Sequence, residues 1–440
     1  MLIFKKMKHN IFNIININLS NKIFLLLLFF FPLIMILRNV TINLAAIIIS
    51  IIFLFFVIKK IEMDFFKNRI LIYLIVFFFF IFVNTLMHTQ DFDIILKSLG
   101  NYRYLILAIS VYLALESISE KSKKVFIYFN LCLVFLLCLD IVYQYIAQEN
   151  IFGFAADFCD KFGKNCVRFS GVFGDELIAG GYIAQIGLLV FFLFQIIKNQ
   201  KSYPQKIIEL FYILFLFVII LITGERNAII IFSLSILFFY FFQKKYLNLI
   251  LIFLLFFLSI FIVSQKIDSV NSRFLFPVDT WGDIYHGKKS TLKEKIIDSP
   301  WMLHYKAATE LFLERPIIGH GAKSFRVLCN DTDIQAKLKN QISRYSACST
   351  HPHNYLLEFL AEHGLIGGML FIGLILGIFV KIFKIRNSHT RESVVAIGVG
   401  SLLLAIMFPF KPSGSFFSTF NASLLFYIMG FFLYYSRKVK

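Results

Sequence analysis

The chain has 440 residues, of which 59% are hydrophobic and 18% aromatic, and its mean hydropathy is +0.78. A soluble fold of this length has too little interior for that much apolar surface, so a soluble protein is excluded. The net charge of +18 resides in short lysine and arginine clusters between apolar runs, with no basic stripe and no nucleic-acid-binding motif, which excludes nucleic acid as a partner.

Apolar runs of transmembrane length recur along the whole chain. The first follows Lys5, Lys6 and Lys8 and continues past Arg38 without a small-residue cleavage site, so we expect a retained anchor and not a signal peptide. The candidate spans are 22–38, 40–58, 69–87, 101–116, 125–145, 177–197, 207–222, 227–243, 247–265, 364–381, 394–410 and 421–436. Lysines and arginines concentrate at the chain ends and in alternate short loops, which predicts that both termini are cytoplasmic.

Two segments between spans are long enough to carry structure on the outer side, 146–176 and 266–354. The second divides the chain into an N-terminal bundle of nine spans (1–265), a large periplasmic loop domain (266–354) and C-terminal spans with the histidine helix (355–440). Within the loop, "SPWMLHYKAATELFLERP" predicts a helix that Ser299 caps, Pro300 opens and Pro316 ends.

Four cysteines lie in these outer segments, two in each. Cys159 and Cys166 share the first, and Cys329 and Cys348 share the second. Pairs confined to one outer loop favour local disulfides in an oxidising compartment, and the alternative is free thiols that happen to lie in loops.

A tight turn, "TGERNAIII", places Arg226 between two predicted spans on the outer side, against the charge bias. A guanidinium there can bind a phosphate through two parallel hydrogen bonds. The alternative is an arginine that extends to the interface and pairs with Glu225.

A second cationic element, "ERPIIGHGAKSFR", contains Arg315, His320, Lys323 and Arg326 around two glycines. Such a turn can bind an anion through backbone and side chains together. It can equally be an ordinary basic surface loop.

The most unusual stretch is "STHPHNYLLEFLAEHGLIGG", from Ser349 to Gly368. We expect Thr350 to be the N-cap and His353 the third helical residue, on one stripe with Gly364 and Gly367. The positive end of the helix dipole favours an anion and lowers the pKa of His353, which keeps the imidazole neutral and able to accept a proton. The alternative is that His353 and Asn354 only cap the helix.

The stretch matches the pattern H-[NSQ]-x9-G-x2-[GTY] of a known family: His353-Asn354 is followed by nine residues, Gly364, two residues and Gly367. The chain resembles the bacterial O-antigen ligases and the related O-antigen polymerases and protein O-oligosaccharyltransferases. The segments "ERPIIGHG", "GERN" and "RFSGVFGDELIAGGYIAQ" are also similar to family landmarks. The resemblance extends from Arg168 to the end, and the first 150 residues carry no motif of the family.

The resemblance implies glycosyl transfer on the periplasmic face of the bacterial inner membrane, without a metal or other cofactor and with inversion. The donor would be a glycan on undecaprenyl diphosphate, and in a ligase the acceptor is lipid A–core. The expected fold is an all-α polytopic, GT-C-like membrane protein with about 12 transmembrane helices and one large periplasmic loop domain. His353, Arg226 and Arg315 would be catalytic; the expected substrate-binding residues are Asn354, Arg168, Lys323, Arg326, Gly364 and Gly367.

This assignment has three alternatives. A polymerase uses the same kind of donor and differs mainly in its acceptor. The D-x-D pairs Asp91/Asp93 and Asp331/Asp333 would suit a metal-dependent glycosyltransferase. A flippase or transporter of lipid-linked sugar is expected to carry internal repeats and mid-membrane polar residues, whereas here the polar residues cluster outside.

Overall fold

A computed structural model of the chain describes residues 22–57, 68–89, 91–157, 166–197, 203–267, 270–271, 274, 299–332, 334 and 347–439. Within these residues the regular elements are helices, and the only β-pairings are isolated bridges between Glu149 and Ala155 and between Asp157 and Arg168. The predicted all-α class is therefore confirmed for the described part of the chain.

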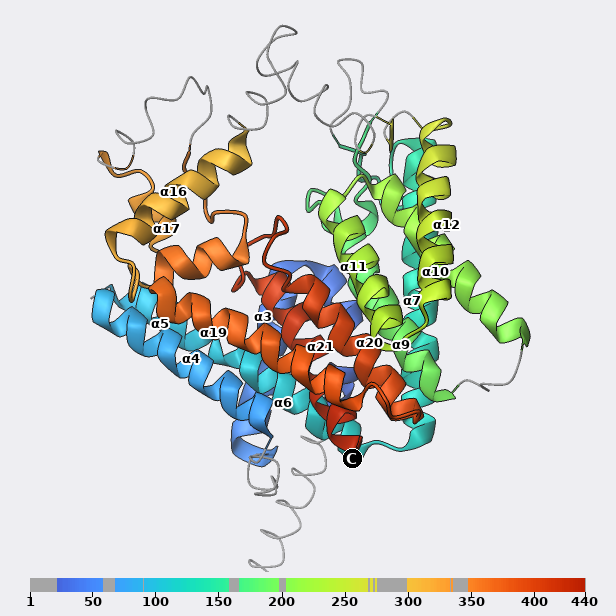
Figure 1. Cartoon of the computed structure of the whole chain (residues 1–440), viewed down its shortest axis with the longest axis horizontal. Helices are drawn as coiled ribbons and strands as arrows, with labels where there is room; N and C mark the ends of the chain where they lie inside the picture. The colour runs from blue at the N-terminus through green and yellow to red at the C-terminus, as the bar shows by residue number, and fades with distance from the viewer. Residues whose placement is uncertain are drawn as a thin grey trace, which may run out of the picture.

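The helices follow one another in the order that the apolar runs predict (Figure 1). Their bounds are α2 Phe31–Ile34, η1 Met35–Leu37, α3 Arg38–Ile52, η2 Phe53–Val57, α4 Arg69–His88, α5 Phe92–Gly100, α6 Tyr102–Ser117, α7 Glu120–Ala147, η5 Gly171–Phe173, α8 Ala179–Tyr182, η6 Ile183–Gly187, α9 Leu188–Ile197, α10 Tyr203–Thr223, α11 Arg226–Phe242, α12 Tyr246–Ser264, α16 Pro300–Glu314, α17 Phe325–Leu328, α19 Tyr355–Ile385, α20 Arg391–Ile406 and α21 Thr419–Lys438.

Seven helical segments among the described residues are long and apolar enough to cross a membrane, and two further apolar helices, Ile207–Thr223 and Arg226–Phe242, are shorter. The chain is thus a multi-pass membrane protein. The predicted break near Arg38 is present, because Arg38 has a non-helical φ of 77° and ψ of 169° between η1 and α3. One predicted boundary differs from the structure: α19 begins at Tyr355, nine residues before the predicted span at 364.

The centre of the bundle is formed by α20 and α21. Helix α21 packs against α6 and α20, and α20 also packs against α9, α11 and α19. Every residue of α21 from Ala422 to Ser436 is buried. By contrast, α12 leaves most of its apolar side chains exposed, as expected for a helix that faces lipid.

The described part of the predicted loop domain contains the helix α16 that the sequence predicted. Ser299 Oγ accepts a hydrogen bond from the amide of Met302 (3.4 Å), Pro300 is the first helical residue, and the helix ends before Pro316. One face of α16 forms a small core with α17 and the first turns of α19, which includes Leu303, Ala307, Leu311, Phe325 and Ala361. This packing fixes the loop domain to α19.

Helix α19 changes direction at Gly364, whose φ of 63° and ψ of −162° are non-helical. Beyond the kink, the amides of Leu365 and Ile366 donate to the carbonyls of Pro316 (2.7 Å) and Ile317 (3.2 Å). The segment expected to bind an anion therefore supplies carbonyl oxygens to the kinked helix. A Cβ on Gly364 would lie 2.4 Å from the Ile317 carbonyl carbon, so both the backbone angle and the close approach require glycine.

We expect Gly364→Ala to lower the free energy of unfolding by roughly 1–3 kcal/mol from backbone strain alone, with the clash added to that. Thermal unfolding in detergent measures the change. Gly377→Ala is the matched control, because a Cβ at Gly377 meets nothing within 4 Å. Equal melting temperatures for the two variants would contradict the role given to the kink.

Candidate active site

His353 lies in the loop before α19 and not within it. Asn354 is the N-cap, and its Oδ1 accepts a hydrogen bond from the amide of Leu357 (3.0 Å). The prediction that Thr350 caps the helix and His353 is its third residue is therefore wrong. His353 has φ 56°, an unusual value for a residue with a side chain. Its carbonyl accepts a hydrogen bond from the amide of Ser413 (2.9 Å), which helps to hold this backbone.

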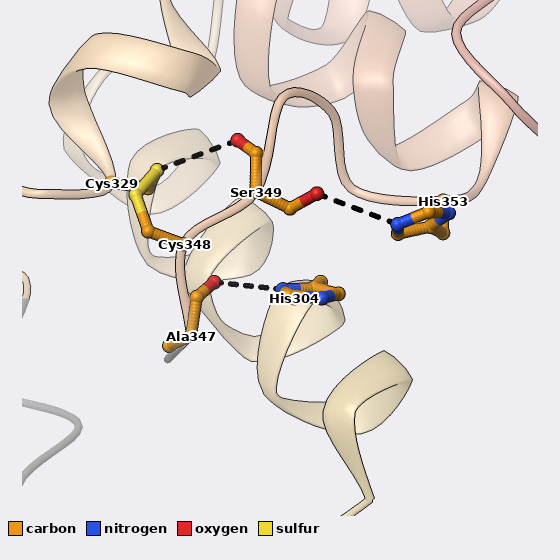
Figure 2. Close-up of a disulfide and its surroundings, with 6 residues drawn as sticks. All are labelled: His304, Cys329, Ala347, Cys348, Ser349 and His353. Atoms are coloured by element: carbon orange, nitrogen blue, oxygen red, sulfur yellow. Dashed lines mark hydrogen bonds between the residues drawn. A yellow bond between two sulfur atoms is a disulfide. The ribbon is translucent and has the colours of Figure 1, made fainter. Parts of the chain in front are cut away.

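Three histidine rings gather in front of α19. The ring centroid of His353 lies 4.2 Å from that of His351 and 5.3 Å from that of His304 on α16. His304 Nδ1 lies 3.0 Å from the Ala347 carbonyl, and His353 Nε2 lies 3.4 Å from Ser349 Oγ (Figure 2). The loop domain thus supplies one wall around the candidate base.

Burial, with the neighbouring His304 as the next cause, lowers the pKa of His353 from 6.5 to about 4. Burial likewise lowers the pKa of His351 to about 3, with His353 as the next cause. The sequence predicted a lowered pKa but attributed it to a helix dipole. At neutral pH the imidazole of His353 is uncharged and able to accept a proton.

The segment between α17 and α19 is crosslinked beside this cluster. Cys329 and Cys348 form a disulfide with Cα atoms 5.2 Å apart, as predicted, and Ala347 and Ser349 flank Cys348 (Figure 2). In the other outer segment Cys166 is disulfide-bonded, whereas its predicted partner Cys159 lies outside the described residues. That second pairing stays a prediction.

Replacing Cys329 and Cys348 with serine is expected to lower the free energy of unfolding by roughly 3 kcal/mol, the chain-entropy value for a loop of about twenty residues. Thermal unfolding with and without a reductant measures the loss. Reductant should lower the melting temperature of the wild type toward that of the double variant. Alkylation of both thiols under non-reducing conditions would contradict the disulfide.

Arg226 lines a cavity of about 430 Å³ together with Arg168. The cavity lies between the start of α11 and the start of α16, because Trp301 of α16 also lines it. Arg168 Nη2 donates to the Leu177 carbonyl (3.2 Å), while its buried Nε has no hydrogen-bond partner among the described residues. Two guanidinium groups at one cavity are a combination that can bind an anionic ligand.

The turn before Arg226 is held by Glu225. Its Oε1 and Oε2 accept hydrogen bonds from the amides of Gly180 (2.7 Å) and Gly181 (3.1 Å) at the start of α8. Burial lowers the pKa of Arg168, and Glu225 and Asp157 oppose the shift, so this guanidinium stays charged. Glu225 therefore positions the wall of the cavity through backbone contacts.

One short segment between α20 and α21, Pro409–Gly414, separates His353 from the arginine cavity. Asn354 Nδ2 donates to the carbonyls of Pro409 (2.7 Å) and Lys411 (3.2 Å) on one side. On the other side, Pro412 and Gly414 line the arginine cavity. The segment therefore connects the candidate base to the anion site. Asn354, expected to bind substrate, instead uses its side chain to cap α19 and hold this segment.

Lys411 is a residue of this site that the sequence reasoning missed. Its side chain is 3% exposed, and its Nζ lies 3.3 Å from Asn227 Oδ1 and 5.3 Å from the centroid of the Tyr355 ring. Burial lowers its pKa to about 7. The signal that singled out Arg226, a cation in a short outer loop against the charge bias, also applies to Lys411.

Other predicted residues lie apart from the arginine cavity. Arg315 is exposed at the far end of α16 from Trp301, roughly 21 Å along the helix, and it does not line the cavity. The amide of Lys323 donates to Glu362 Oε2 of α19 (2.8 Å), and Arg326 is exposed on α17. Gly364 and Gly367 belong to the kink, where a Cβ on Gly367 would meet the side chain of His363.

The acidic pair considered for a metal has a structural explanation in the described residues. Asp91 is the N-cap of α5 and accepts a hydrogen bond from the amide of Asp93 (2.9 Å), and Asp93 pairs with Lys97. Asp331 is described but Asp333 is not. No group of three metal-ligating side chains was found among the described residues.

A search of curated proteins finds no match to the chain. Residues 211–372 match the family model described as O-antigen ligase. The match spans most of α10, all of α11, α12, α16 and α17, and α19 past its kink, and so includes Arg226, Arg315 and His353. Residues 211–372 therefore contain an O-antigen ligase domain, which supports the family that the motif beginning at His353 predicted.

Proposed function

We propose that this protein is an O-antigen ligase of the bacterial inner membrane, with its active site on the periplasmic face. It would transfer a glycan from undecaprenyl diphosphate to lipid A–core, without a metal and with inversion at the anomeric carbon. The family match supports ligase- or polymerase-type glycosyl transfer in general. The observation that carries the proposal is the cationic Arg168–Arg226 cavity beside the segment that holds the neutral His353.

In the proposed reaction, His353 takes the proton of the acceptor hydroxyl while the hydroxyl oxygen attacks the anomeric carbon of the donor. The bond from that carbon to the phosphate oxygen breaks, and undecaprenyl diphosphate leaves with the bonding electrons. Arg226 and Arg168 stabilise the negative charge that grows on the leaving group. Attack from the face opposite the diphosphate inverts the anomeric configuration.

The residues that line the cavity support a lipid-linked substrate. Its walls combine the start of α11 with Trp301 of the loop domain, so a diphosphate there can keep its lipid tail in the membrane and its glycan outside. Lys411 lies behind the wall, where its Nζ donates to Asn227 Oδ1. Arg315 stays a proposed phosphate ligand on the resemblance alone.

The lipopolysaccharide of a deletion strain tests the proposal and separates ligase from polymerase. Loss of a ligase should leave long glycans on undecaprenyl diphosphate and unmodified lipid A–core. Loss of a polymerase should instead leave single repeat units on the core. Unchanged lipopolysaccharide and unchanged lipid-linked glycan would contradict both activities.

The acid limb of the pH–rate profile is expected to lie near pH 4, the pKa of His353, and not near 6.5. Activity should hold from neutral pH down to about pH 5, because His353 is uncharged there. Stability should fall between about pH 6.5 and 4, since the unfolded chain binds this proton at the higher pKa. Initial rates over short assays, with separate unfolding curves, distinguish the two effects. A half-maximal rate at pH 6.5 without unfolding would contradict a buried base.

A further inference from the structure

A second cavity lies at the other end of the bundle, between the start of α4, the second half of α19 and the end of α21. Its volume is about 770 Å³. Helix α19 begins beside His353 and carries this cavity on its last three turns, and the carboxyl end of α21 lies far from α16 (Figure 1). The cavity, called the basal groove below, is therefore separate from the candidate active site.

The walls of the basal groove change character along α19. Leu374, Leu376 and Val380 line its inner part, and Lys381 and Lys384 line the part nearest the helix end. From Gly373 to Lys384 the helix rises roughly 16 Å, which is close to half of the ~30 Å hydrocarbon thickness of a bilayer. The groove thus has the length and polarity of one leaflet, apolar inside and cationic at the surface.

The surface end of the basal groove is positively charged. Arg69, the first residue of α4, joins Lys381 and Lys384, and none of the described lining residues is acidic. The fourth cation, Arg437, donates to the hydroxyl of Tyr112 and lies 3.9 Å from Glu116, so its charge is partly balanced. The positive end of the α4 dipole adds to the attraction for a phosphate at this position.

The inner end of the basal groove has free volume beside the helix backbone. A Cβ added to Gly377 would meet nothing within 4 Å. Tyr73 bridges α4 and α19 near the inner end, where its hydroxyl donates to the Leu370 carbonyl (2.9 Å). An acyl chain can therefore lie along α19 at Gly377 without displacing a side chain.

We propose that the basal groove binds an anionic phospholipid, with its phosphate against Arg69, Lys381 and Lys384 and an acyl chain beside Gly377. Charge decides against a zwitterionic lipid, because an added ammonium group gains nothing from three cations. With the termini in the cytoplasm, the lipid comes from the cytoplasmic leaflet. The site does not depend on the reaction proposed above.

Native mass spectrometry of the full chain, with phosphatidylglycerol or phosphatidylcholine added to the detergent micelles, tests the proposal. Wild type should retain phosphatidylglycerol in preference to phosphatidylcholine. Lys381→Gln/Lys384→Gln should weaken phosphatidylglycerol binding roughly 30-fold, on the basis of about fivefold per cation. The matched control, Lys124→Gln/Lys244→Gln, removes the same charge outside the groove and should bind as wild type does.

A second variant separates a lipid from a free phosphate. Gly377→Leu fills the open space and should reduce phosphatidylglycerol binding while leaving the melting temperature in lipid-free detergent unchanged. Excess glycerol 3-phosphate should not displace the lipid. The proposal is overturned if wild type binds both lipids equally, if the control variant weakens binding as much as the groove variant, or if glycerol 3-phosphate displaces the lipid completely.

Discussion

Replacing His353 with alanine is expected to lower the rate of glycan transfer by about 10²–10⁴-fold, the usual contribution of a general base. The imidazole accepts a proton in the proposed reaction, and burial keeps it neutral at physiological pH. The folded state should survive, because the amide of Ser413 donates to the His353 carbonyl, a backbone contact that alanine retains. The rate of transfer by purified protein from a lipid-linked donor measures the loss of activity. A melting curve measures whether the fold is retained.

The best control for this variant is His389→Ala. His389 is exposed in the turn after α19, far from the site, and its variant should transfer glycan at the wild-type rate. His351 is not a neutral control, because its ring packs against the ring of His353. We now expect His351→Ala to have an intermediate effect. A His353→Ala protein that transfers at near the wild-type rate would leave the residue only a structural role.

Arg226→Lys is expected to lower the rate of transfer by about 10²–10³-fold, comparable to the loss of one transition-state donor. Lysine keeps the charge, but it cannot form the two parallel hydrogen bonds that guanidinium makes to a phosphate. The loss should appear in kcat, because negative charge on the leaving group develops in the transition state. Initial rates over a range of donor concentrations separate kcat from KM.

Arg391→Lys is the matched control for this substitution. Arg391 is exposed at the start of α20 and donates to the Ile196 carbonyl (3.0 Å), a contact that lysine can replace. Arg315→Lys is the informative comparison, because the resemblance makes Arg315 catalytic and the structure places it outside the arginine cavity. If Arg226→Lys kept wild-type activity and Arg315→Lys lost it, the anion would bind at the end of α16 and not in the arginine cavity.

Local patterns predicted the features that depend on neighbouring residues. The Ser299–Pro300 start of α16 and its end before Pro316 follow from capping and proline geometry. The pairing of Cys329 with Cys348 followed from their shared loop. The arginine at position 226 was found because a cation in a short outer turn opposes the charge bias, and it does line a cavity.

The features that sequence reasoning missed depend on contacts far apart in the chain. The sequence "EHGLIGG" continues a helical pattern. The helix can kink at Gly364 because the carbonyls of Pro316 and Ile317 accept hydrogen bonds from the amides that follow it. The conformation of His353 depends in the same way on Ser413, about sixty residues later. Capping propensity allowed both Thr350 and Asn354 as N-cap, and tertiary contacts to Asn354 decided between them.

The segment from Pro409 to Gly414 acts as a spacer of fixed length. It meets Asn354 through the carbonyls of Pro409 and Lys411, and the amide of Ser413 meets the carbonyl of His353. One inserted or deleted residue between Pro409 and Ser413 would put these contacts out of register even if every side chain were retained. Among natural variants of this protein, the number of residues between α20 and α21 is therefore expected to vary less than the residue types that fill it.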